Sequence, residues 1–250
     1  TDADVERLRL LHGLVERGHS IGGIATLPDV DLRHMSAAFP PPASEAPTHH
    51  LPEVRERVME AIERLQVNEA EQMLSRAALS TEPVEFLKQI VGPILVEVGE
   101  RWDSGELRIA HEHACSAVMR GLLFSLMRLY PATDATRRVV VATPAGEDHE
   151  LGALMVSMLA AMHGWSALYL GPNLPAAEIA YAVEETEAEL LMLSVANLDE
   201  AASRRELGAI ESALPRRVKI MAGGRAASTE DGSRIVLEQD LEVVASSLSR

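Results

Sequence analysis

The chain has 250 residues, enough for two compact domains, and its net charge of −15 disfavours binding of nucleic acid or anionic membrane by the body of the protein. Hydrophobic residues make up 47% and aromatic residues only 3%, so aliphatic side chains must build the cores, which suits helices and buried parallel strands. A single cysteine, Cys115, excludes an internal disulfide and predicts a reducing, cytoplasmic location. The first residues lack a secretory signal and no apolar run reaches about 20 residues, so we expect no membrane association.

Two N-terminal segments precede the main body of the protein. Residues 1–37 are expected to form short helices, because Leu8, Leu11 and Leu14 recur at helical spacing. Residues 38–50 are rich in proline and alanine and lack a periodic apolar pattern, which predicts a linker.

Residues 51–133 have a helical apolar pattern, with breaks at Asn68, at 80–83 and at 104–105. This pattern predicts a four-helix bundle that caps the rest of the chain. In the third helix, five apolar residues lie three or four positions apart: Leu87, Ile90, Ile94, Val98 and Trp102. That spacing places them on one helix face and predicts that Trp102 points inward.

Residues 134–250 show a different period. Four short apolar runs alternate with helical segments, at 139–141, 167–170, 191–193 and 219–221. The alternation predicts an α/β domain with a parallel sheet and crossover helices, of the flavodoxin-like or Rossmann-like type. A fifth strand is expected at Leu241–Ala245.

Ligands of an open parallel sheet bind beyond the carboxyl ends of its strands, so the loops there are the candidate site. The first of these loops carries His149, and either Glu147 or Asp148 could accept the second ring N–H of this imidazole. Four small residues in the same loops leave room for a ligand to approach the backbone: Gly152, Ser194, Gly223 and Gly224. No set of further metal-ligating residues accompanies His149, which favours a metal carried by its own macrocycle over a metal held by protein alone.

Three segments together resemble the cobalamin-binding domain shared by methionine synthase, corrinoid shuttle proteins and light-sensing regulators. They are Glu147 to Gly152, then Ser194-Val195-Ala196, then Gly223-Gly224. The resemblance implies that His149 replaces the dimethylbenzimidazole of the cofactor on cobalt and that the freed nucleotide tail enters a slot between these loops. Ala196 departs from the family, in which leucine is commoner.

A second motif is similar to the Trp-x9-Glu-His motif of the light-dependent CarH and LitR regulators. Here it runs from Trp102 to Glu112 and His113. The resemblance implies that the tryptophan covers the upper face of adenosylcobalamin and that the Glu-His pair holds the adenosyl group. Ile109 lies on the same helix face as Glu112 and His113, so we expect it to add apolar contact. Asp103 stands where the best-known light-sensing members have a histidine, so a photoproduct with two histidine ligands is not expected.

The N-terminal segment resembles the later helices of a MerR-type winged-helix domain, from Asp4-Val5-Glu6-Arg7-Leu8 to Ile24-Ala25. The helix-turn-helix and wing that precede these helices in that family are not in this sequence. We expect either that the chain was trimmed or that this member lacks the DNA-binding head.

The leading hypothesis is a cobalamin-dependent, light-responsive regulator whose homo-oligomeric state, dimer or tetramer, is set by adenosylcobalamin between bundle and sheet. DNA would be contacted only through a winged-helix head that is incomplete here. A second hypothesis is a sensor without that head which carries a bilin, with His34, His49 and His50 as candidate contacts. A third is a corrinoid shuttle subunit that presents methylcobalamin to a methyltransferase. The sequence has no nucleophile-base constellation, so we expect no enzyme activity of its own.

Overall fold

The computed structural model describes residues 51–130 and 137–249, together with Arg7, Pro28, Asp29 and Leu32. The chain divides into two compact units, Thr1–His50 and Leu51–Arg250, and the second unit holds nearly all described residues. The MerR-like helices and the linker fall almost wholly outside the described residues, as does the expected boundary between residues 133 and 134. These parts of the domain division stay predictions.

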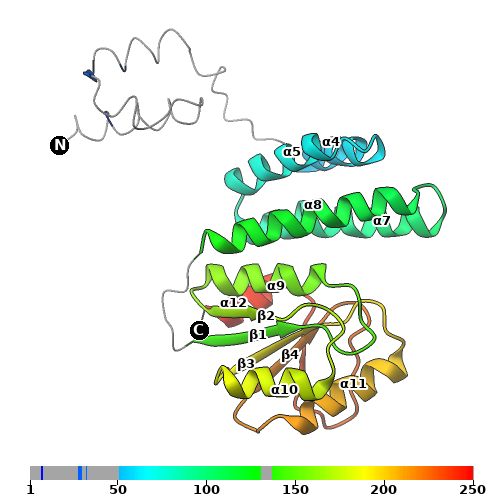
Figure 1. The fold of residues 1–250 in the computed structure, drawn as a ribbon, viewed down its shortest axis with the longest axis vertical. Helices are drawn as coiled ribbons and strands as arrows, with labels where there is room; N and C mark the ends of the chain where they lie inside the picture. Colours follow the sequence, from blue (N-terminus) through cyan, green and yellow to red (C-terminus); the bar gives the residue numbers. More distant parts are fainter. Residues whose placement is uncertain (1–6, 8–27, 30–31, 33–50, 131–136, 250) are drawn as a thin grey trace. The chain divides into compact units, whose positions relative to one another are not determined.

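The first half of the second unit is helical (Figure 1). Its elements are α4 (Leu51–Glu63), α5 (Val67–Ser80), α6 (Pro83–Phe86), a π-helical turn η1 (Leu87–Val91), α7 (Gly92–Asp103) and α8 (Ile109–Arg128). Because α6, η1 and α7 follow one another without a break, four helices result, as predicted; we call them the helical cap. The first break is not at Asn68, which lies inside α5. Leu65 instead adopts a positive φ of 54° and ends the preceding helix.

The core of the helical cap contains most of the predicted stripe. Leu87, Ile90, Ile94 and Val98 are all buried. The inward orientation predicted for Trp102 is wrong, since this residue is 46% exposed. Trp102 lies in the last turn of α7, where the chain folds back: the backbone N–H of Leu107 donates to the carbonyl of Arg101 at 2.9 Å, and Leu107 rather than Trp102 is buried.

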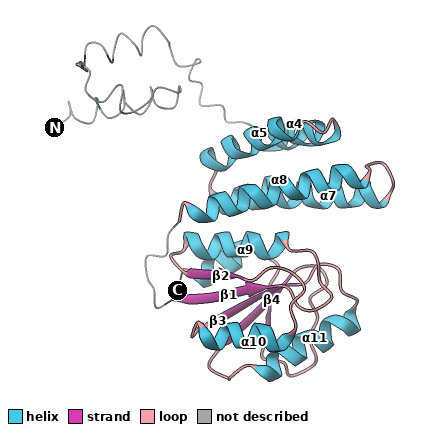
Figure 2. Ribbon diagram, viewed as in Figure 1, coloured by secondary structure: helices cyan, strands magenta, loops and turns pink. Residues whose placement is uncertain are grey.

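The second half is an α/β layer (Figure 2). Its strands are β1 (Arg138–Ala142), β2 (Ser166–Tyr169), β3 (Leu190–Ser194), β4 (Lys219–Gly223) and β5 (Val236–Leu237). All four neighbouring pairs are parallel and the strand order is β2-β1-β3-β4-β5. This is the flavodoxin-like order, whose direction of winding reverses between β1 and β3, so the predicted fold class is confirmed.

The strand expected at Leu241–Ala245 is wrong. That segment belongs to helix α12 (Leu241–Leu248), and the fifth strand is the short β5 before it. The side chain of Asp240 accepts a hydrogen bond from the backbone N–H of Glu242 at 2.8 Å and thereby caps the helix. A short apolar run cannot be assigned to strand or helix by periodicity, and this cap decides for a helix.

Helices cover both faces of the sheet. Figure 1 shows α9 (Leu151–Met162) and α12 on one face and α10 (Ala176–Glu185) and α11 (Glu200–Ala213) on the other. The side chains of α9 belong to the same apolar cluster as those of α8, so the helical cap packs on α9. Helix α9 begins directly after the loop that follows β1. Because α8 packs on α9, α8 lies next to that loop. Among the described residues, no helix combines the length and apolar character needed to cross a bilayer.

Candidate functional site

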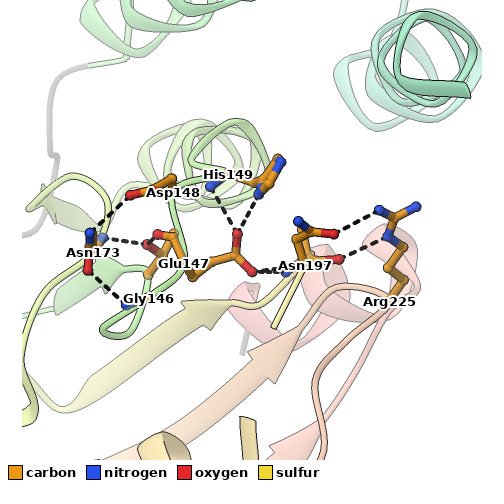
Figure 3. A network of polar contacts seen from close by, with 9 residues as sticks. Gly146, Glu147, Asp148, His149, Asn173, Asn197 and Arg225 are labelled. Atoms are coloured by element: carbon orange, nitrogen blue, oxygen red, sulfur yellow. Dashed lines mark hydrogen bonds and ion pairs between the residues drawn. The ribbon is translucent and has the colours of Figure 1, made fainter. Parts of the chain in front are cut away.

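The loop after β1 lies at the point where the sheet reverses its winding, and its shape is fixed by short hydrogen bonds (Figure 3). Gly146 adopts a φ of +85° and its N–H donates to the side-chain oxygen of Asn173 at 2.8 Å. The hydroxyl of Thr143 accepts from the N–H of Asn173 at 2.8 Å and donates to the carbonyl of Glu147. The loop therefore presents Glu147 and the two residues after it in one defined arrangement.

Glu147 orients His149. The carboxylate of Glu147 is fully buried, and one of its oxygens accepts from the ring Nδ1 of His149 at 2.7 Å and from the backbone N–H of His149 at 2.9 Å. The other oxygen accepts from the backbone N–H groups of Ala196 and Asn197, at 2.7 and 2.6 Å. Burial alone would raise the pKa of Glu147, but the N–H groups of Asn197 and His149, the imidazole of His149 and the N–H of Ala196 hold that pKa below its usual value.

The geometry leaves one nitrogen of His149 available. An ionised carboxylate can only accept, so the neutral imidazole places its hydrogen on Nδ1 and has its lone pair on Nε2. The side chain is 57% exposed, so Nε2 can reach a ligand outside the loop. Of the two carboxylates considered from the sequence, Glu147 contacts the imidazole, whereas Asp148 accepts from the side-chain amide of Asn173 at 3.0 Å.

A slot lies between the sheet, α9 and α12, with Val96 of α7 also in its lining, and it includes Gly152, three residues after His149. It encloses about 340 Å³, and its lining includes the four predicted small residues, Gly152, Ser194, Gly223 and Gly224, with Met155, Met192 and Met221. A Cβ atom at Gly152 would be 2.5 Å from the hydroxyl oxygen of Ser194, and one at Gly223 would be 2.5 Å from the carbonyl of Glu238. Side chains larger than glycine would fill the slot at these positions.

Val195 has a different place from its predicted neighbours. Its side chain is buried in the core on the α10 and α11 side of the sheet. Its carbonyl is 2.3 Å from the position of a Cβ at Gly224, whose φ is +98°. Val195 therefore contributes backbone to the turn beside the slot rather than a side chain to its lining.

The helical cap presents the second set of predicted residues. Trp102 and Ile109 are exposed, 46% and 57% respectively, and they lie at the same end of the α7-α8 pair. Glu112 of α8 accepts from the hydroxyl of Ser116 at 2.7 Å and pairs with Nδ1 of His113. Against the effect of burial, the bonds from Ser116 and His113 and the charges of His113 and His149 lower the pKa of Glu112. The structure thus brings Glu112 within electrostatic range of His149.

Several polar residues of this region were missed by sequence reasoning. Asn173 follows β2 at the same sheet edge, and Arg225 directly follows Gly223-Gly224. The guanidinium of Arg225 donates to the carbonyl of Ala196 at 2.9 Å and contacts the side-chain oxygen of Asn197 at 3.4 Å, which holds the two residues that donate to Glu147 (Figure 3). Glu150, next to His149, was also missed. Adjacency to the motif residues was the available signal in each case.

Other candidate residues lie apart from the site or outside the described part of the chain. Cys115 is a buried core residue, and burial raises the pKa of its thiol to about 12. Asp103 is exposed. His34, His49 and His50, the candidate bilin contacts, are outside the described residues. Among the residues that are described, no group of three or more His, Cys, Asp or Glu side chains could hold a metal ion.

Two family models match the chain. One, described as a B12 binding domain, matches residues 54–126, which form the helical cap, and another of the same description matches residues 137–244, which form the α/β layer. Both the helical cap and the α/β layer therefore match models of B12 binding domains.

The chain is also similar to individual proteins of known role or structure. The chain is 29% identical over 229 residues to the HTH-type transcriptional repressor CarH of Myxococcus xanthus, covering 91% of this chain and 76% of that protein. It is 24% identical over 160 residues to dimethylamine corrinoid protein 2 of Methanosarcina mazei, covering 62% and 75%. The solved structure of the monomethylamine corrinoid protein of Methanosarcina barkeri shares the fold, with a TM-score of 0.61, 15% identity and coverage of 79% of this chain and 97% of that one. The predicted resemblance to CarH-type cobalamin-binding regulators is confirmed.

Proposed function

We propose that the chain is a cobalamin-dependent, light-responsive transcription regulator in which adenosylcobalamin is ligated by His149 and sets the oligomeric state. One observation carries the proposal: buried Glu147 orients the imidazole of His149, whose side chain is exposed, at the loop that leads into the slot-lining residue Gly152. A histidine oriented by a carboxylate is a strong axial ligand for a metal. The similarity to CarH over 91% of the chain supports the regulatory role.

The described residues fit such a cofactor. His149 would bind cobalt from below, and the slot at Gly152, Ser194, Gly223 and Gly224 would hold the nucleotide tail. Trp102 and Ile109 supply exposed apolar area on the side of the helical cap, and Glu112 and His113 supply hydrogen-bonding groups for the upper ligand. When bound, adenosylcobalamin supplies a cobalt–carbon bond that light can break.

The regulator would act as a homo-oligomer in the reducing interior of the cell and would not be an enzyme. Its net charge of −15 disfavours DNA contact by the body of the protein, so DNA would be bound through a winged-helix head. Ligand binding can change assembly only if one arrangement of the helical cap binds the cofactor better than another. A cofactor between cap and sheet meets this condition.

The experiment compares the native protein with the variants His149→Ala and His163→Ala, the second being a histidine at the end of α9 that contacts Ser249. We expect the native protein and His163→Ala to bind adenosylcobalamin in darkness with the spectrum of a histidine-ligated corrinoid, and His149→Ala to bind it weakly and without that spectrum. Sizing in darkness and after green light tests the switch. Unchanged mass after complete photolysis would remove oligomer control, and an unchanged spectrum in His149→Ala would remove the ligand.

A corrinoid shuttle is the second candidate, favoured by the similarity to the dimethylamine corrinoid protein. A shuttle has no need of an upper wall for an adenosyl group. Methyl transfer that persists when Trp102 and Glu112 are both replaced by alanine would support the shuttle against the regulator. Absorption of the purified protein in the red would support the remaining hypothesis, a bilin as second chromophore.

A further inference from the structure

Glu150, the residue after His149, joins the loop to the helical cap. One of its oxygens accepts from Nε of Arg120 on α8 at 2.5 Å, and the other accepts from the hydroxyl of Tyr169 at the end of β2. The Glu150 side chain is only 14% exposed. Burial and the bond to Glu150 raise the pKa of Tyr169, so its hydroxyl stays protonated and remains a donor.

Apolar packing accompanies these polar bonds. The ring of Phe124, one helical turn beyond Arg120 on α8, meets the ring of Tyr169 edge to face with 5.7 Å between centroids. Edge-to-face aromatic pairs are favourable beyond the area they bury. Arg120, Glu150 and Tyr169, which we call the cap network, therefore connect α8, the residue next to His149 and the sheet in one place.

Helix α8 carries both Arg120 of the cap network and Glu112, the residue proposed to contact the upper ligand. Glu112, Ser116 and Arg120 are spaced four residues apart, which places them along one ridge of the helix. Ser116 donates to Glu112, and Arg120 contacts Glu150. The position of Glu112 relative to His149 is thus coupled to the cap network through helix α8, which rises about 12 Å between Glu112 and Arg120.

We infer that the cap network sets the separation between α8 and His149 and thereby makes the site selective for a corrinoid with a large upper ligand. The inference rests on the proposed function. If the corrinoid lies between the helical cap and His149 as proposed, a change in the position of α8 would alter contacts to the upper ligand more than contacts to His149 and the slot, whose lining includes one cap residue, Val96. These three residues are positioning residues that need not touch the cofactor.

A second ion pair across the same interface provides a matched control. Lys88 of η1 pairs with Asp240 and Glu242, the first two acidic residues at the start of α12. This pair also joins the helical cap to the α/β layer, but it lies on another helix and does not involve the residues around His149. If general loosening of the cap were enough to change selectivity, Lys88→Gln would have the same effect as Arg120→Gln.

The experiment measures binding of adenosylcobalamin and hydroxocobalamin in darkness by absorbance titration of the apoprotein. We expect Arg120→Gln to weaken adenosylcobalamin binding about fivefold to tenfold, a usual size for coupling between sites, and to leave hydroxocobalamin binding within about twofold. Tyr169→Phe, which keeps the ring contact with Phe124, should act in the same direction to a smaller extent. Lys88→Gln should change neither affinity, and thermal unfolding of each apoprotein checks that it folds.

Three outcomes would overturn the inference: equal losses for both corrinoids, equal effects of Lys88→Gln and Arg120→Gln, or no effect of Arg120→Gln and Tyr169→Phe. Tyr169→Phe decides alone if Arg120→Gln does not fold. If the native protein bound neither corrinoid, the proposed function would fail and the inference with it. If the native protein bound both corrinoids and the variants gave any one of these three outcomes, only the inference would fail.

Discussion

Replacing Glu147 by glutamine tests the arrangement of the site without removing volume. The carboxylate of Glu147 accepts four hydrogen bonds, from the ring and backbone of His149 and from the backbone N–H groups of Ala196 and Asn197. A glutamine has one oxygen and one NH2 group. If the NH2 faces Ala196 and Asn197, two backbone N–H groups lose their acceptor; if it faces His149, the backbone N–H of His149 loses its acceptor and the imidazole hydrogen must move to Nε2, the nitrogen proposed to bind cobalt. An unsatisfied buried donor costs about 1–3 kcal/mol, and because the better orientation leaves one backbone donor unsatisfied, we expect a loss of stability of about 1–3 kcal/mol.

Urea unfolding of the apoprotein at neutral pH, followed by circular dichroism, measures this loss. The matched control is Asp148→Asn, since the Asp148 carboxylate is exposed and accepts a hydrogen bond from the side chain of the exposed Asn173. Surface substitutions of this kind change stability by about 0.5 kcal/mol or less. Cobalamin affinity should fall about 10- to 100-fold in Glu147→Gln, as for other residues that orient a metal ligand. Equal stability losses in the two variants would refute the reasoning.

Two further predictions concern the pH dependence of folding and the slot. The hydroxyl of Ser233 and the N–H of Arg234 lower the pKa of Glu211, so this group stabilises the fold above its unfolded pKa of about 4.3 and loses that effect as the pH falls through its lower folded pKa. Melting curves of native protein and Glu211→Gln should differ at neutral pH and converge near pH 3; a constant difference would contradict this. Gly152→Val should weaken binding of cobalamin but not of cobinamide, which lacks the nucleotide tail, in spectroscopic titrations, because its Cβ would lie 2.5 Å from the Ser194 hydroxyl. Equal weakening of both would contradict it.

The sequence predicted the features that depend on local pattern. The buried strands β1 and β3 are continuous apolar runs, and the loop that carries His149 follows the first of them, so both the sheet and the edge that holds the site could be placed. Helix α12 begins at the cap made by Asp240, a signal that the apolar run alone does not contain.

Features that depend on distant residues could not be predicted. Trp102 was expected inside because the apolar spacing of α7 continues to its end, but the buried position there is taken by Leu107 from the following loop. Arg120 and Glu150 are 30 residues apart and lie on different layers, so their pairing follows only from the packing of α8 on α9. The choice of Glu147 over Asp148 as partner of His149 likewise depends on Ala196 and Asn197, some 50 residues away.

The surroundings of helix α9 are uncommon for a helix of an α/β protein. Its sequence is apolar on nearly all sides, because it is covered by the sheet on one side and by α8 on the other. Any outward shift of α8 must therefore uncover apolar side chains of α9 to water, at a cost of about 25 cal/mol for each Å². A second protein surface could cover the same atoms. Displacement of the helical cap would therefore expose an apolar surface that can bind another protein chain.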